Sequence, residues 1–338
     1  MRNQGRIMRS VLRLSVPLPG GRLPRCVGAR APQRLSLMMS TSAESPSSTS
    51  RAEGLDSAVQ GKIREQVHPT IKGRRRFYEG ASVRPVPPGE GEGTSPKFEV
   101  TLDGRALKSP GRRPMHVESE ALAWGIALEW DAQTGKRGIE PSTMPLMSLT
   151  STWLDQTAGD RGLVIKNVGK YLATDTACFY AEPALRQLRK RQEKAFEPLH
   201  EWMSSEWGCP LATTDEVFRL KHPPRSVARV LAMVHALDDP ALTALQCAVM
   251  ECKSLVVALA VVLRRMKPAK AEFVSRLEEE FQIEQWGLVE GGHDMDIVAA
   301  KVQLASASAF LHLLDGDQGH ARRLDRLKQA LLAHELAA

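Results

Sequence analysis

The sequence contains none of the common local motifs of an enzyme. It has no GxxxxGK(S/T) segment to cradle a nucleotide phosphate, no GxSxG segment to carry a nucleophilic serine, and no HExxH segment to bind zinc. Residues 89–93 (GEGEG) are rich in glycine, but their two acids would repel phosphate, so we interpret them as a surface loop. Since an active site can be assembled from distant residues, these absences weaken the case for an enzyme without closing it.

Cysteine is scarce and is not spaced for metal binding. The chain has five cysteines: Cys26, Cys178, Cys209, Cys247 and Cys252. No pair has CxxC spacing, and the last two, five positions apart, would lie about 140° apart around a helix. We therefore expect neither a zinc site nor a disulfide framework, and we expect no cofactor.

The chain also lacks a long hydrophobic run. Its most apolar stretch, residues 255–263, has nine residues between Lys253 and Arg264. A membrane span needs about 20 residues. This stretch is predicted to be a buried helix, and the body of the protein is not expected to span a membrane.

Acidic residues are missing from the N-terminus. Residues 1–43 contain eight arginines and no lysine, aspartate or glutamate. This composition is typical of an organelle transit peptide, with a disordered basic tail as the alternative. The whole chain carries a net charge of +7 from 46 basic and 39 acidic residues, and without this leader 38 basic and 39 acidic residues remain, a net of −1. The body therefore gives no electrostatic reason to expect nucleic acid as a partner.

Residues 77–110 are predicted to form strands. Apolar residues alternate with polar ones over residues 98–102, which is the period of a strand. Asp103-Gly104 follows at once and is typical of a two-residue hairpin turn, because both of its positions need positive φ. Residues 105–109 would form the return strand.

Helical spacing and capping residues dominate the rest of the chain. We expect a helix at 118–131 and then helices at about 185–203, 224–237, 239–266, 268–286 and 296–314. Most of the six tryptophans fall on the apolar faces of such elements and are expected in the core, with interface anchors as the alternative. The predicted fold class is an α+β N-terminal domain followed by an all-α C-terminal helical domain. The predicted order is a transit peptide (1–43), a linker (44–73), the α+β domain (74–180), a helical bundle (181–314) and a polar C-terminal extension (315–338).

Candidate functional residues gather late in the chain. Glu280 and Glu284 are four residues apart and so share one helix face, which is either a solvated surface or a functional acidic patch. His293 and Asp294 pair an imidazole with a carboxylate, either as a base or ligand or as a turn and helix cap. Together these four residues define the enzyme alternative: a soluble matrix enzyme that uses the acidic face.

Six short segments, taken in order and spacing, resemble one family. They are RFY at 76–78, VTLDGRALKSP at 100–110, EWDAQ at 129–133, MPL at 144–146, TDTACF at 174–179 and FQIEQWG at 281–287. The sequence resembles the mitochondrial ATP synthase assembly chaperones that act on the alpha subunit of the soluble catalytic sector. The resemblance extends over about residues 74–314.

The resemblance implies a non-enzymatic role in the mitochondrial matrix. Such a chaperone would bind the unassembled alpha subunit, shield its beta-facing interface from aggregation and be displaced during assembly. It would need no cofactor and no small-molecule substrate. The resemblance points to Glu280, Glu284 and Glu290 as partner-binding residues, with Arg105 and Lys108 near the hairpin as second choices. A permanent subunit of an organellar complex is a further alternative, which would remain in the mature assembly.

Overall fold

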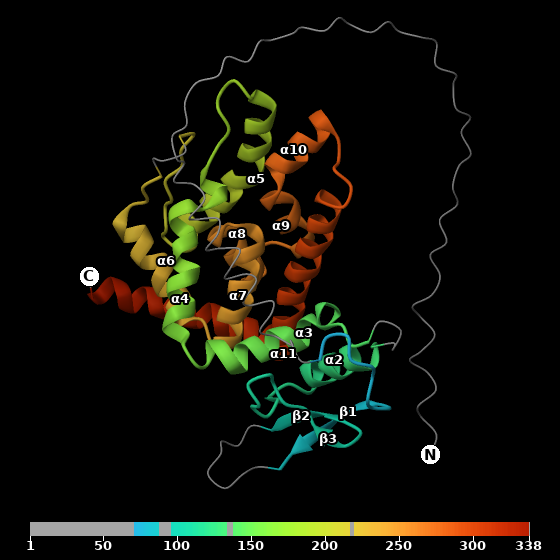
Figure 1. The fold of residues 1–338 in the computed structure, drawn as a ribbon. Coiled ribbons are helices and arrows are strands. Elements are labelled where there is room, and N and C mark those ends of the chain that lie inside the picture. Colours follow the sequence, from blue (N-terminus) through green and yellow to red (C-terminus); the bar gives the residue numbers. More distant parts are fainter. Residues whose placement is uncertain (1–70, 88–95, 134–137, 217–219, 338) are drawn as a thin grey trace, which may run out of the picture. The chain divides into compact units, whose positions relative to one another are not determined.

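The computed structural model describes residues 71–87, 96–133, 138–216 and 220–337. All of them belong to one compact unit, residues 52–338. The predicted leader, most of the predicted linker and the GEGEG loop lie outside the described residues. Within the unit a small antiparallel sheet is followed by many helices, which confirms the predicted fold class (Figure 1).

The sheet is built around one central strand. Its strands are β1 (Ala81–Val86), β2 (Lys97–Leu102), β3 (Arg105–Ala106) and β4 (His116–Val117). β2 pairs antiparallel with the other three. Because β2 is central, its polar residues Glu99 and Thr101 are also buried and need partners. Glu99 pairs with Arg84 and lies 3.5 Å from His116, and the Thr101 hydroxyl lies 3.0 Å from that of Ser82.

The predicted hairpin turn is present between β2 and β3. Asp103 and Gly104 have φ values of 48° and 78°, as the turn requires. The Asp103 carboxylate also accepts hydrogen bonds from the backbone N–H groups of Glu79 and Gly80, each at 3.0 Å. These bonds lower the pKa of Asp103 and tie the turn to the start of β1.

Helix α2 (Glu120–Asp131) packs against β1 and β2. Ser119 caps it by accepting a hydrogen bond from the N–H of Leu122 at 3.2 Å. The buried Trp130 meets the ring of Tyr78 edge-on, and the Tyr78 hydroxyl donates to the Trp130 carbonyl at 2.7 Å.

Helices form the rest of the described chain. In order they are α3 (Pro145–Thr152), α4 (Arg161–Lys170), α5 (Arg186–Ser205), α6 (Pro224–Ala236), α7 (Asp239–Cys252), α8 (Leu255–Val262), α9 (Pro268–Ser275), α10 (Leu277–Trp286) and α11 (His293–Ala337). Short helical turns are η1 (Pro141–Thr143), η2 (Trp153–Thr157), η3 (Tyr171–Thr174) and η4 (Thr176–Cys178).

The prediction of one helix over 239–266 is wrong, because the chain breaks between α7 and α8. Lys253 adopts a left-handed conformation, and Ser254 caps α8 by accepting from the N–H of Val257 at 3.0 Å. The buried Asp175 accepts a second N–H of this turn, that of Val256, at 3.0 Å. Burial raises the pKa of Asp175 to about 6.

The prediction of one helix over 268–286 is also wrong. The break falls at Arg276, whose φ and ψ are −116° and 18°. Its buried guanidinium lies 2.9 Å from Glu272, 2.7 Å from Glu279 and 3.1 Å from Glu280. One arginine thus pairs with carboxylates of both α9 and α10. These ion pairs offset the free-energy cost of removing the guanidinium from water.

Helix α11 bends at Gly316 (φ 57°, ψ −149°), at the predicted stop. Residues 317–337, expected as a polar extension, continue as helix and bury Leu327 and Leu331. By length and composition alone α11 could cross a membrane. Since it packs against α6, α7 and α9, and a core helix meets the same criterion, this carries little weight.

Candidate functional site: an exposed surface at α10 and α11

Glu280 and Glu284 of α10 are held by arginines of the same chain. Arg191 of α5 makes a bidentate pair with Glu284, at 2.8 and 2.7 Å. The hydrogen bonds from Arg191 lower the pKa of Glu284. Glu280 pairs with Arg276. These two predicted site residues therefore hold α10 in place. Because each carboxylate is already paired with an arginine, it is less available to bind a cation of a partner protein.

Glu290 lies in the loop between α10 and α11 and is exposed. Asp294 and Asp296 are exposed in the first turn of α11. Within the described ranges, none of the three carboxylates forms an ion pair. Their negative charges are therefore not neutralised by a cation of the described chain.

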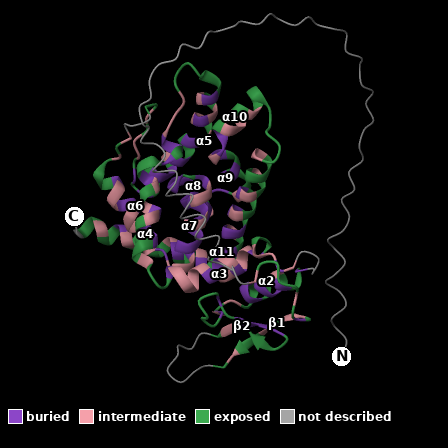
Figure 2. Cartoon of the chain, in the orientation of Figure 1, coloured by how far each residue is buried: buried purple, intermediate pink, exposed green. Residues whose placement is uncertain are grey.

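Exposed apolar residues precede and follow these acids along the chain. Trp286 is 81% exposed, and Leu288 and Val289 follow it in the loop. Met295, Val298 and Val302 are exposed on α11, at spacings of three and four that place them on one helix face. We call Trp286, Leu288, Val289, Met295, Val298 and Val302 the α10–α11 apolar surface. Figure 2 shows that exposed residues predominate at the end of α10 and in the segment that follows it.

The sequence did not single out this surface, because helical apolar spacing is the same whether a face packs inside the chain or against a partner. Trp130, Trp202 and Trp207 are buried as expected, whereas Trp286 is the most exposed of the tryptophans. One signal was available: Trp286 is followed by Gly287 and lies beside three glutamate positions and a Gly-Gly pair. A tryptophan at the end of such an acidic helix can be an interface anchor, because tryptophan is enriched at the binding hot spots of interfaces.

Arg105 and Lys108 are exposed at the hairpin. The sheet lies at the opposite end of the described fold from α10 (Figure 1). The structure therefore does not bring these basic residues together with the glutamates, and the predicted site residues form two separate regions.

The enzyme alternative gains no geometric support. The Nδ1 of His293 accepts a hydrogen bond from the N–H of Val289 at 3.2 Å, which shapes the turn before α11. Asp294 is exposed on the helix. No cluster of potential metal ligands occurs among the residues that the structure describes.

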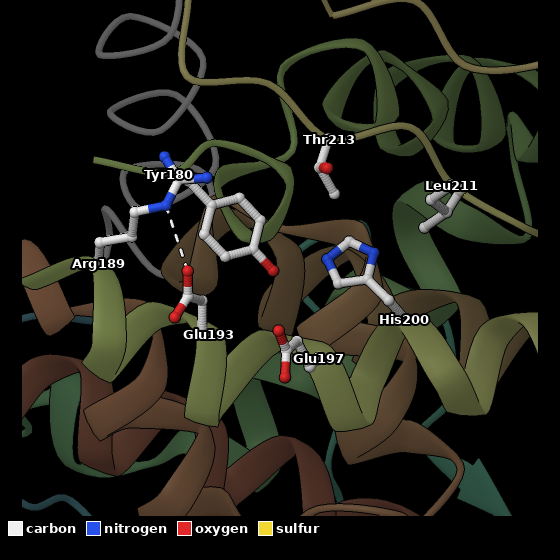
Figure 3. A pocket seen from close by; sticks show the side chains of 7 residues that line it. All are labelled: Tyr180, Arg189, Glu193, Glu197, His200, Leu211 and Thr213. Atoms are coloured by element: carbon white, nitrogen blue, oxygen red, sulfur yellow. Dashed lines mark hydrogen bonds and ion pairs between the residues drawn. The ribbon is translucent and has the colours of Figure 1, made fainter. Parts of the chain in front are cut away.

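A cavity of about 320 Å³ lies elsewhere, against α5. Its lining residues are Tyr180, Arg189, Glu193, Glu197, His200, Leu211 and Thr213 (Figure 3). None of them belongs to the predicted site.

Comparison with known proteins identifies the family. The model of the ATP12 chaperone protein family matches residues 75–204. The crystal structure of Atp12 from Paracoccus denitrificans is 31% identical in sequence, with a TM-score of 0.64, and the match covers 71% of this chain and 98% of that one. The chain belongs to the ATP12 chaperone family.

Two further relatives agree. The mitochondrial protein atp12 of Schizosaccharomyces pombe is 28% identical over 226 residues, 64% of this chain and 77% of that protein. The Atu1473 protein of Agrobacterium tumefaciens is 26% identical, with a TM-score of 0.62 over 70% of this chain and 86% of that one. The family inferred from the six segments is thereby confirmed, and with it the expectation of a chaperone rather than an enzyme.

Proposed function

We propose that this ATP12-family chaperone binds the unassembled alpha subunit of mitochondrial ATP synthase and shields its beta-facing interface until assembly. The α10–α11 apolar surface is the observation that carries the proposal. Exposed apolar residues gathered in one segment, with exposed acids among them, are typical of a protein-binding site. An unassembled subunit likewise exposes apolar surface. In the complex, each protein would cover the exposed apolar surface of the other.

Exposed acids around an apolar centre suit a complex that must dissociate. The apolar centre supplies most of the binding free energy, whereas rim charges mainly set orientation and association rate. The beta subunit can then displace the chaperone by competing for the same interface, and no nucleotide site is needed for release. Glu290 would act at this rim, with Asp294 and Asp296 beside it.

Glu280 and Glu284 would contribute by positioning α10, through Arg276 and Arg191. Arg105 and Lys108 would form a second, weaker contact at the hairpin. This division follows from where their partners lie: the two glutamates are paired within the chain, and the two basic residues are exposed far from α10.

The arginine-rich residues 1–43 support import into the mitochondrial matrix. The Schizosaccharomyces pombe relative is named as a mitochondrial protein.

Co-expression with the alpha subunit, with and without the beta subunit, tests the function. We expect soluble alpha subunit to co-purify with the chain in the first case and to be released from it in the second. If the alpha subunit aggregates and nothing co-purifies, the proposed partner is wrong. If a complex forms but persists with the beta subunit present, displacement is wrong and a permanent subunit becomes the better interpretation.

A further inference from the structure

The first half of α5 is rich in basic side chains. Five of the nine residues from 186 to 194 are basic and one is acidic. Two of the five are engaged within the chain. Arg189 pairs with Glu193 at 3.2 Å (Figure 3). Arg191 pairs with Glu284 at 2.7 Å. The other three form what we call the α5 basic stripe: Arg186, Lys190 and Lys194.

The α5 basic stripe follows one line along the helix. Its three residues are four positions apart, and all are exposed. Within the ranges that the structure describes, none of the three forms an ion pair. The opposite face of α5 is buried through Leu188, Phe196 and Leu199, so the helix is fixed with its stripe toward solvent.

The stripe destabilises the helix that carries it. Like charges four residues apart repel each other on a helix surface. Arg186 is also the first residue of α5, where the positive end of the helix dipole disfavours a cation, and Leu185 before it offers no capping side chain. Since proteins break such local rules mainly at functional sites, binding explains the stripe better than folding does.

The stripe adjoins the α10–α11 apolar surface. Helix α5 packs against α10 (Figure 1). Arg191, the residue after Lys190, makes the bidentate pair with Glu284 that joins the two helices. Glu284 in turn lies two residues before Trp286. The stripe and the apolar surface therefore belong to the same end of the described fold.

This end of the fold carries both signs of charge in separate places. The cations lie on α5, and the acids Glu290, Asp294 and Asp296 lie in the segment after α10. An anionic membrane or a nucleic acid is negative throughout, so the stripe would attract it and the acids would repel it. A protein can match each region with the opposite charge. The pattern therefore favours a protein as the partner.

We propose that the α5 basic stripe binds an acidic segment of the protein that this chaperone holds. The inference rests on the proposed function and adds the chemistry of a second contact. Arginine and lysine side chains have hydrogen-bond donors and no acceptor, so carboxylates are their matching ligands. Because the stripe is exposed beside the apolar surface, it acts mainly on the orientation and the association rate of the partner.

Coupling with a water-soluble carbodiimide tests the contact, because it joins a lysine amine to a carboxylate that touches it. The probe is polyglutamate, added to the full chain. Residues 1–43 contain no lysine, so the basic leader cannot be coupled. We expect Lys190 and Lys194 to be coupled roughly tenfold more than Lys166, an exposed lysine of α4, and added salt to remove the difference. Equal coupling of the three lysines at low salt would overturn the proposal.

A triple variant measures the effect on binding. Changing Arg186, Lys190 and Lys194 together to Gln should slow association with the alpha subunit roughly tenfold at low ionic strength and leave it near the parent rate at high ionic strength. Its unfolding free energy should be unchanged or higher, because the repulsion within α5 is gone.

The matched control removes the same charge from exposed positions outside α5 and α10. It changes three residues to Gln: Lys166, Arg322 and Lys328. This variant should associate at nearly the parent rate. Equal association rates for the two folded triple variants contradict the proposal.

Coupling within the alpha-subunit complex separates the possible failures. Amide bonds from Lys190 or Lys194 to the subunit support the proposal, and bonds from other lysines alone overturn it. If no complex forms, the proposed function fails, while polyglutamate coupling still decides whether the stripe takes acidic segments. Sedimentation with cardiolipin-containing vesicles tests the membrane alternative: vesicle binding lost in the stripe variant and kept in the control would assign the stripe to a membrane instead.

Discussion

Two apolar regions of this protein have similar side chains and opposite surroundings. All eight residues of α8 are buried, between α7, α9 and other helices. The α10–α11 apolar surface has Trp286, Met295 and Val298 largely in solvent. The comparison separates two uses of apolar residues: those of α8 stabilise the fold of this chain, and those of α10–α11 are available to stabilise a complex. Substitutions should therefore affect unfolding in the first region and binding in the second.

The largest effect is expected for Leu259→Ala in α8. Leu259 is fully buried, so truncation removes apolar burial and leaves a cavity, which costs about 3 kcal/mol of unfolding free energy. Denaturant unfolding measures it. Leu163→Ala, at an exposed position of α4, is the control and should change stability by less than about 0.5 kcal/mol. Equal losses in the two variants would contradict the contrast in burial.

The next largest effect on folding stability is expected at a buried carboxylate, that of Glu129. Glu129 accepts hydrogen bonds from the N–H groups of Leu146 and Met147, at 2.7 and 2.8 Å, and so fixes the start of α3. Burial nevertheless raises its pKa from 4.5 to about 7.

The sign of the pH dependence follows from that direction. Between pH 4.5 and 7 the folded chain holds a proton on Glu129 that the unfolded chain has lost, so stability falls as pH rises across this window. The contribution is at most about 3 kcal/mol. Glu129→Gln should flatten this slope in unfolding experiments at several pH values, whereas Glu118→Gln, at an exposed position, should leave it unchanged. A slope that survives in Glu129→Gln would assign it to other groups, with the buried Asp175 the first to test.

How far the sequence predicts the structure depends on how far apart in the sequence the interacting residues lie. The Asp103-Gly104 turn is set by the φ preferences of two adjacent residues, and it was predicted correctly. The break between α7 and α8 depends partly on Asp175, which lies far back in the chain and accepts from Val256. The capping residue Ser254 was a local signal for it, but the continuous apolar pattern outweighed that signal.

The candidate site shows the same limit. Helix periodicity placed Glu280 and Glu284 on one face, but it carried no information about Arg191, 93 residues before Glu284. Nor can periodicity separate an apolar face packed inside the chain from one left exposed, and for this reason the surface around Trp286 was missed. Whether the glutamates take part in binding stays a prediction.

Trp286→Ala should have the opposite effects to Leu259→Ala: it should leave folding stability nearly unchanged and weaken binding. With 81% of the residue exposed, its loss is expected to change unfolding free energy by less than about 0.5 kcal/mol. Binding of the alpha subunit should weaken by about 2 kcal/mol, or roughly 30-fold, as for a central aromatic anchor. The matched control is Trp124→Ala on α2, an exposed tryptophan at the other end of the described fold. If the two variants bind the alpha subunit equally well, the α10–α11 surface is not the docking site.

The smallest effect is expected for Glu290→Lys, which probes the rim rather than the apolar centre. An exposed carboxylate at a rim contributes less than about 1 kcal/mol, mostly through the association rate, and salt screens it. The variant should therefore associate more slowly at low ionic strength and approach the parent as salt is added, with unchanged unfolding. Glu118→Lys, exposed ahead of α2, applies the same charge change away from this surface and should leave the rate unaltered. A loss of affinity that persists at high salt would place Glu290 inside the interface, and the docking surface would then extend over the loop as well as α11.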